Sequence, residues 1–164
     1  VGVPFGPAHS SLWLRTSAGY CYGGRTDPFA NFFFGGFGNN WVDHQDPKRY
    51  RQYESFPGIE LNAAGGTSFV RSMVDLNLPP LRFRRLGALE FYAAWARMSL
   101  FAGGLVTEPG RDAYRRRLAD VGAQVDVRLA LMIQQPLTFS FGYARAFERH
   151  RPVTDEWMVS LKVL

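Results

Sequence analysis

Apolar and polar residues alternate along several stretches of the chain, the period-two pattern of strands with two unlike faces. The longest stretch is residues 120–134, where an unbroken apolar set alternates with small or polar residues such as Gln124 and Asp126. The pattern predicts an all-β chain of about seven strands, near residues 11–22, 29–37, 67–78, 86–101, 120–134, 137–147 and 156–164.

The predicted connections alternate in length. Short ones fall at residues 23–28, 79–85 and 134–136, and long ones at residues 38–65, 97–117 and 148–155. Several strands reach the roughly 9–11 residues that cross a membrane at a barrel tilt, whereas strands in soluble proteins average about five or six. Short turns at one end and long loops at the other are typical of outer-membrane barrels. We therefore expect residues 1–164 to form one domain, part of an antiparallel transmembrane β-barrel in a bacterial outer membrane.

The two strand faces have separate expected environments, because a barrel presents an apolar outside to lipid and a polar inside to its lumen. The residues expected to face lipid are Val121, Val125, Val127, Leu129, Leu131, Phe139, Phe141 and Trp157. Those expected to face the lumen are Arg71, Asp75, Glu90, Asp126 and Arg128. The alternative is a soluble β-sandwich or lipocalin-like binding module, in which the polar set would face bulk water.

Composition and charge limit the classes of binding partner that we expect. No run of about 18 apolar residues is present, so the sequence predicts no transmembrane helix. The formal charge of +5 would suit either nucleic acid or an anionic membrane surface. With a barrel as the predicted fold, we expect outer-membrane lipid and lipopolysaccharide as partners and no nucleic acid. Arginines that could pair with lipopolysaccharide phosphates occur in the long connections, at Arg111, Arg115, Arg116, Arg117, Arg149 and Arg151.

Motifs for covalent chemistry are not found. The sequence contains no nucleophile elbow, glycine-rich phosphate loop or Cys/His cluster, so we expect neither an enzyme nor a bound cofactor. Asp43, His44 and Asp46 have a composition common in polar loops, and no metal site is predicted there. Cys21 is the single cysteine, which excludes an intramolecular disulfide.

Several elements recur in a familiar order from residue 29 onward. An aromatic strand ends in Gly35-Gly36, a long loop contains Arg51-Gln52-Tyr53, and a second glycine pair opens the stretch from Gly65 to Pro79. Strand-like stretches follow at residues 89–95, 121–125 and 136–144. This order resembles the C-terminal half of the bacterial surface antigen superfamily, which includes barrels that assemble outer-membrane proteins and the pores of two-partner secretion.

The resemblance implies a barrel that inserts or translocates polypeptides, with unfolded polypeptides as substrates. It also implies a larger barrel of about sixteen strands, to which this chain contributes the C-terminal part and whose remaining strands are partners. The loop arginine of the family pairs with an acidic residue on the barrel wall. That role would pass to Arg51 beside Tyr53, with Asp75, Glu90 or Asp126 as partner, although Gln52 stands where the family has glycine. A passive porin-like or structural barrel is the alternative within the same fold.

The end of the chain carries a further expectation. Trp157, Val159, Leu161 and Val163 share a face, so an aromatic residue in phase with them would come directly after Leu164. Outer-membrane barrels usually finish on such an aromatic residue. We therefore expect the natural protein to continue by at least one residue, and about seven strands alone to leave two unpaired edges that lipid does not tolerate.

Overall fold

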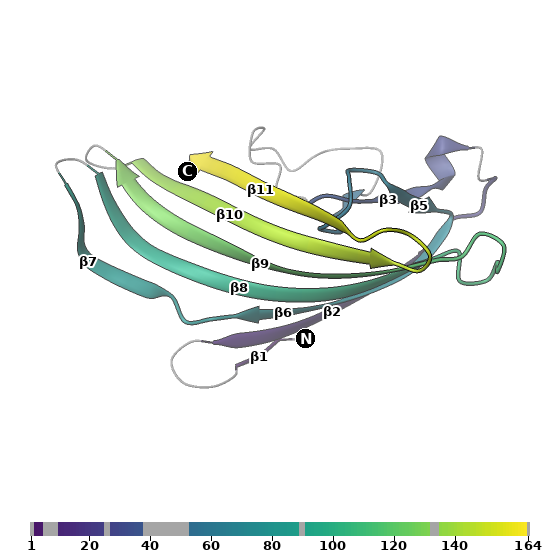
Figure 1. Cartoon of the computed structure of the whole chain (residues 1–164), viewed down its shortest axis with the longest axis horizontal. Coiled ribbons are helices and arrows are strands. Elements are labelled where there is room, and N and C mark those ends of the chain that lie inside the picture. Colours follow the sequence, from purple (N-terminus) through teal and green to yellow (C-terminus); the bar gives the residue numbers. More distant parts are fainter. Residues whose placement is uncertain are drawn as a thin grey trace.

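The computed structural model describes residues 2–4, 10–24, 27–37, 53–88, 91–131 and 135–163. The fold is all-β, and its large sheet is antiparallel with the order β1-β2-β6-β8-β9-β10-β11, while β7 also pairs with β8. The strands of this sheet are β1 (Gly2–Pro4), β2 (Ser11–Tyr20), β6 (Ser68–Asn77), β7 (Leu81–Ala88), β8 (Phe91–Thr107), β9 (Arg116–Leu131), β10 (Gln135–Glu148) and β11 (Thr154–Val163). Figure 1 shows these strands forming a strongly curved, open sheet.

A second, smaller sheet lies on the concave side of the large one (Figure 1). It contains β3 (Phe32–Phe34), β4 (Tyr53–Glu54) and β5 (Ala64–Gly66) in the order β4-β3-β5, and a 3-10 turn (Pro28–Ala30) precedes it. We call residues 32–37 and 53–66 the inner segment. Its buried side chains pack on the large sheet in one cluster: Phe34, Phe56, Ile59 and Ala64 with Phe69, Leu105, Leu118 and Ala146.

The two faces of the large sheet differ in the exposure of their side chains. Register places Phe141 beside Val125 on one side and Val159 on the other, so apolar residues line up across the outer face. Val159 is 66% exposed and Trp157 63% exposed, whereas Asp126 on the inner face is only 6% exposed. Apolar side chains of the outer face are thus left uncovered by the described chain, while carboxylates lie buried on the polar face.

The predicted turn at residues 79–85 is wrong. Strand β8 pairs with β6 along Ser99–Thr107 and then with β7 along Phe91–Ala96, so β7 continues the line of β6. Pro79-Pro80 interrupts this line without reversing it, because proline removes a ladder hydrogen bond but the partner strand still spans the gap. The next strand consequently lies at Phe91–Thr107 instead of 86–101, and the predicted loop 97–117 shortens to residues 108–115.

The strand predicted at residues 29–37 is present only at Phe32–Phe34, and its expected place in the large sheet is wrong. Strand β2 pairs directly with β6, from Tyr20 opposite Ser68 to Ser11 opposite Asn77. Only Phe32–Phe34 is a strand here, and it belongs to the small sheet. Three successive phenylalanines cannot form one polar and one apolar face, which explains why this strand is enclosed instead of standing in the wall. The predicted loop 38–65 contains β4 and the start of β5.

The connections differ at the two ends of the sheet. Residues 21–67, 108–115 and 149–153 leave one end, and the pairs β7–β8 and β9–β10 are joined at the other (Figure 1). The end with the longer connections also holds the inner segment. No helix among the described residues is long and apolar enough to cross a membrane.

Candidate functional site: the polar inner face

Backbone of the inner segment lies directly against strands β10 and β11 at Gly58. The Gly58 N–H donates to Oε2 of Glu156 at 2.9 Å, and its carbonyl accepts from Oγ1 of Thr154 at 2.7 Å. Gly58 has a φ of +95°, and a Cβ placed there would lie 2.7 Å from the backbone nitrogen of Ala146. Both the conformation and the close approach therefore require glycine.

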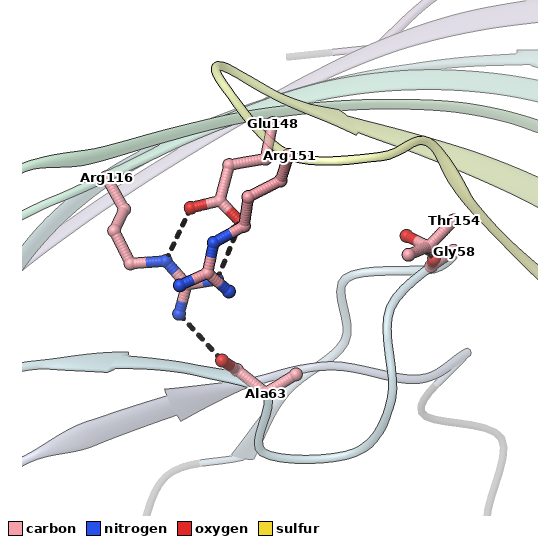
Figure 2. Close-up of polar contacts among 6 residues, drawn as sticks. All are labelled: Gly58, Ala63, Arg116, Glu148, Arg151 and Thr154. Atoms are coloured by element: carbon pink, nitrogen blue, oxygen red, sulfur yellow. Dashed lines mark hydrogen bonds and ion pairs between the residues drawn. The ribbon is translucent and has the colours of Figure 1, made fainter.

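Arg116 connects the inner segment with β9 and β10, two strands of the large sheet. From the start of β9, its Nε and Nη2 donate to the two carboxylate oxygens of Glu148, at 2.7 and 2.8 Å. Its Nη1 donates to the carbonyl of Ala63 at 2.7 Å, and Arg151 lies 3.5 Å from the same carboxylate (Figure 2). We call Gly58, Ala63, Arg116, Glu148, Thr154 and Glu156 the loop anchor.

We call the exposed apolar side chains of the outer face the apolar band. The Arg116–Glu148 ion pair lies near the end of the strands, beyond the level at which this band stops. At this end of the strands the outer face carries exposed charges, Arg117, Arg145 and Asp155. Hydrogen bonds from Arg116 lower the pKa of the Glu148 carboxyl below its ordinary value of 4.5, against an opposing effect of burial. The same hydrogen bonds raise the pKa of the Arg116 guanidinium. Both groups therefore remain charged at neutral pH. The two hydrogen bonds between them fix the orientation of one side chain relative to the other.

A buried clamp joins the ends of β6 and β8 beside the anchor. The backbone N–H and the hydroxyl of Thr67 donate to Oε1 of Glu108 at 2.7 and 3.0 Å, and the Glu108 N–H donates to the carbonyl of Ser68 at 2.9 Å. Glu108 is only 2% exposed. These bonds fix Thr67, where the chain passes from the inner segment into β6 of the large sheet.

Further along the inner face, Asp126 is the centre of a polar network. It accepts from Oγ of Ser140 and Nε2 of Gln124, both at 2.7 Å, and from Nη2 of Arg97 at 3.1 Å. A buried carboxylate is costly unless it is paired and hydrogen-bonded, and here it has three donors. Asp75 lies on the same face with Arg15 at 3.4 Å. This face is therefore built to hold charge.

A cavity of about 670 Å³ opens between the inner segment and the β10–β11 connection. Its walls include apolar side chains such as Ile59 and Leu118 together with Arg116, Glu148 and Glu156 of the loop anchor. Within the described ranges, no group of three His, Cys, Asp or Glu residues could hold a metal ion. Asp43, His44 and Asp46 lie outside the described residues.

The structure places the predicted site residues as follows. Arg71, Asp75, Asp126 and Arg128 lie on the inner face. The outer face carries Val121, Val125, Val127, Leu129, Phe139, Phe141 and Trp157. Contact of these faces with lumen water and with lipid stays a prediction. Arg51 and Glu90 lie outside the described residues, as do the side chains of Tyr53 and Leu131, whose backbones belong to β4 and β9.

Sequence reasoning assigned Arg116 and Glu148 to loops and therefore missed the loop anchor. In the structure β9 begins at Arg116 and β10 ends at Glu148. A signal was available, because Arg116 is in phase with Asp126 and would share its face if the strand were extended. Among the described residues, Arg116 therefore links the large sheet to the inner segment. Its side chain projects from β9, a strand of the large sheet.

Comparison with known proteins assigns no family. No family model matches the chain, and neither the curated proteins nor the solved structures contain a match.

Proposed function

We propose that this chain is a segment of a bacterial outer-membrane β-barrel whose outer face contacts lipid. The observation that carries the proposal is the exposed apolar outer face, with Val159 and Trp157 uncovered there and Asp126 buried on the opposite face. In water this arrangement would expose a large apolar surface, which is unfavourable. In a membrane the same faces meet lipid and an aqueous lumen.

An aromatic cluster at the edge of the apolar band supports this orientation. The rings of Tyr143 and Trp157 are 4.4 Å apart, and those of Phe141 and Trp157 are 5.6 Å apart. Arg145 and Asp155 follow directly on the outer face of the same two strands. Aromatic girdles followed by charges mark membrane interfaces in barrels, because an aromatic ring with a polar group suits the headgroup level.

The boundary of the apolar band runs obliquely across the strands. On β10 the first outward charge is Arg145, which lies opposite Val121 of β9. On β9 the first outward charge comes four residues earlier in the chain, at Arg117. Strands that tilt by about 35–45° against the membrane normal require such an offset between neighbours.

Closure of the barrel is part of the proposal. Within the described large sheet, β1 and β11 are the outermost strands and each has an unpaired side, as does β7, which pairs with β8 alone. Lipid offers no hydrogen bonds to an open edge, so further strands of the same barrel would pair there.

The activity we propose is insertion or passage of polypeptides, as in the bacterial surface antigen superfamily that the sequence resembles. Support comes from the inner segment, which lies on the polar face and is held there by the loop anchor. In a closed barrel such a segment would narrow the lumen at one end, which suits a regulated path more than a permanently open pore.

Site-directed labelling would test the membrane orientation. In a Cys21→Ser background, Val125→Cys should resist a membrane-impermeant maleimide in whole cells and react after detergent extraction. Val153→Cys, 52% exposed beyond the apolar band, is the matched control and should react in both states. Equal labelling of both positions before extraction, or recovery of the protein without detergent, would refute the membrane location.

A depletion experiment would test the activity. Loss of the protein should reduce the amount of correctly inserted outer-membrane proteins or of a secreted polypeptide. Unchanged amounts of both, together with lower permeability to small solutes, would identify a passive barrel instead.

A further inference from the structure

A second cavity, of about 290 Å³, lies between residues 108–115 and the β10–β11 connection and is rich in arginine. Its lining includes Arg115, Arg116, Arg117 and Arg149, but only two carboxylates, Asp112 and Glu148. Each carboxylate has an arginine partner, because Asp112 lies 2.6 Å from Arg115 and Glu148 lies 2.7 Å from Arg116. Arg117 and Arg149 add positive charge that these two carboxylates do not balance.

The cavity lies beside the apolar outer face. Arg117 is on the outer face of β9 and is exposed, and Val121 follows on the same face four residues later. Phe147, on the outer face of β10, is 43% exposed beside Ala119. A ligand held by Arg117 could therefore also contact apolar side chains.

Chemistry that fits this juxtaposition is a phosphate group attached to a hydrocarbon chain. Guanidinium groups bind phosphate oxygens through paired, charge-assisted hydrogen bonds, and several arginines around one cavity match the charge of a phosphate monoester. Free phosphate would use the arginines but leave the apolar neighbours without a partner. A phosphorylated membrane glycolipid uses both.

We propose that this arginine cavity binds the phosphate group of a phosphorylated glycolipid in the outer leaflet, with lipopolysaccharide as the partner. The inference rests on the proposed membrane location and deepens it by naming the lipid that contacts this end of the barrel. Arg117 and Arg149 contact the phosphate, and the acyl chains lie along Val121 and Val125, which follow Arg117 on the outer face of β9. The bound lipid would fix the depth of the wall in the membrane at the end that carries the loop anchor.

Binding would be measured on the protein purified from membranes in zwitterionic detergent. The probes are lipopolysaccharide, the same lipopolysaccharide after enzymatic dephosphorylation, and inorganic phosphate alone. Lipopolysaccharide should bind at least about tenfold more tightly than its dephosphorylated form, since one charge-assisted contact alone corresponds to about that ratio. It should also bind more tightly than inorganic phosphate, because free phosphate lacks the contacts with apolar side chains. The double variant Arg117→Gln/Arg149→Gln should lose about tenfold or more in affinity.

Arg82→Gln provides the matched control, because it removes an exposed arginine of β7 far from the cavity. It should leave the affinity unchanged, and Arg117→Lys should retain only part of it, because lysine keeps the charge without the bidentate geometry. Equal weakening by Arg82→Gln, equal binding of the dephosphorylated lipid, or equal binding of inorganic phosphate would each overturn the inference. A membrane-embedded protein with no preference for phosphorylated lipid would refute this site alone, whereas a protein recovered without detergent would refute the proposed function.

Discussion

Arg116 and Glu148 form a bidentate ion pair, with Nε–Oε1 at 2.7 Å and Nη2–Oε2 at 2.8 Å. The third hydrogen bond of the guanidinium goes to the carbonyl of Ala63, so one side chain joins β9, β10 and the inner segment. The position of the inner segment on the wall therefore depends on a pair that sequence alone separates by 32 residues.

Removal of this pair should loosen the inner segment. Arg116→Ala should lower the free energy of unfolding by about 1–3 kcal/mol, because Glu148 loses two hydrogen bonds and keeps the more distant Arg151, and the Ala63 carbonyl loses the hydrogen bond from Arg116. Urea unfolding in detergent, with proteolysis within residues 53–66, would measure it. Arg115→Ala is the control. Arg115 pairs with Asp112, which is 88% exposed, and donates to the exposed carbonyl of Pro109, so removing its side chain should cost less than about 1 kcal/mol. Equal costs for the two variants would contradict a structural role for Arg116.

Acid should weaken the same pair in a defined pH range. The pKa of Glu148 is below 4.5 in the folded protein, so its contribution to stability is complete above pH 4.5. That contribution declines below pH 4.5 and is lost once the pH has fallen through the folded pKa. The free energy of unfolding should therefore fall more steeply with acid in the native protein than in Glu148→Gln, and parallel curves would refute this assignment.

Gly58 should not tolerate a side chain. Gly58→Ala should cost about 1–3 kcal/mol, because alanine is strained at a φ of +95° and its Cβ meets the backbone of Ala146. The inner segment should then become more sensitive to protease. Gly110→Ala offers the comparison, since a Cβ there has no heavy atom within 4 Å. If both variants resist protease equally, the close approach at Gly58 does not hold the segment.

Charge on the outer face should be costly only within the apolar band. Val127→Arg should lower the free energy of unfolding from lipid vesicles by about 2–4 kcal/mol if Val127 lies near the midplane. Val153→Arg, outside the band, should cost about 0–1 kcal/mol. Similar costs at the two positions, or a Val127 variant that is stable without lipid, would argue for the soluble alternative.

The network around Asp126 should matter for the wall itself. Asp126→Ala removes the acceptor shared by Ser140, Gln124 and Arg97, leaving the Arg97 guanidinium without this partner. We expect a loss of about 2–4 kcal/mol in urea unfolding. Asp126→Asn keeps an acceptor and should recover part of that loss, and no recovery would point to charge alone as the stabilising factor.

Strands with two unlike faces were predictable. Between Val121 and Leu129 the alternation is unbroken, and the structure keeps that register through β9 and β10. Period-two alternation is a local property, because successive side chains of a strand point to opposite faces whatever the rest of the chain does. The face shared by Asp126 and Arg128 followed from the same rule.

Strand ends and partners were less predictable. Pro79-Pro80 has the composition of a turn, yet β8 is long enough to pair on both sides of it. Arg116 and Glu148 flank turn-like sequence, and they belong to β9 and β10 because Arg116 pairs with Thr107 of β8 and Glu148 pairs with Leu118 of β9. Pairing energy from a partner overrides local turn preference, and a single sequence does not display that energy.

The sequence by itself determined that this chain forms long strands with one apolar and one charged face, because side-chain alternation needs no knowledge of neighbours. Only the tertiary structure decided that Phe32–Phe34 leaves the wall and that residues 53–66 return to the polar face, held by Gly58 and Arg116. These contacts join residues far apart in the chain. Their formation depends on curvature of the whole sheet and on close backbone approach, and no local pattern of residues encodes either of them.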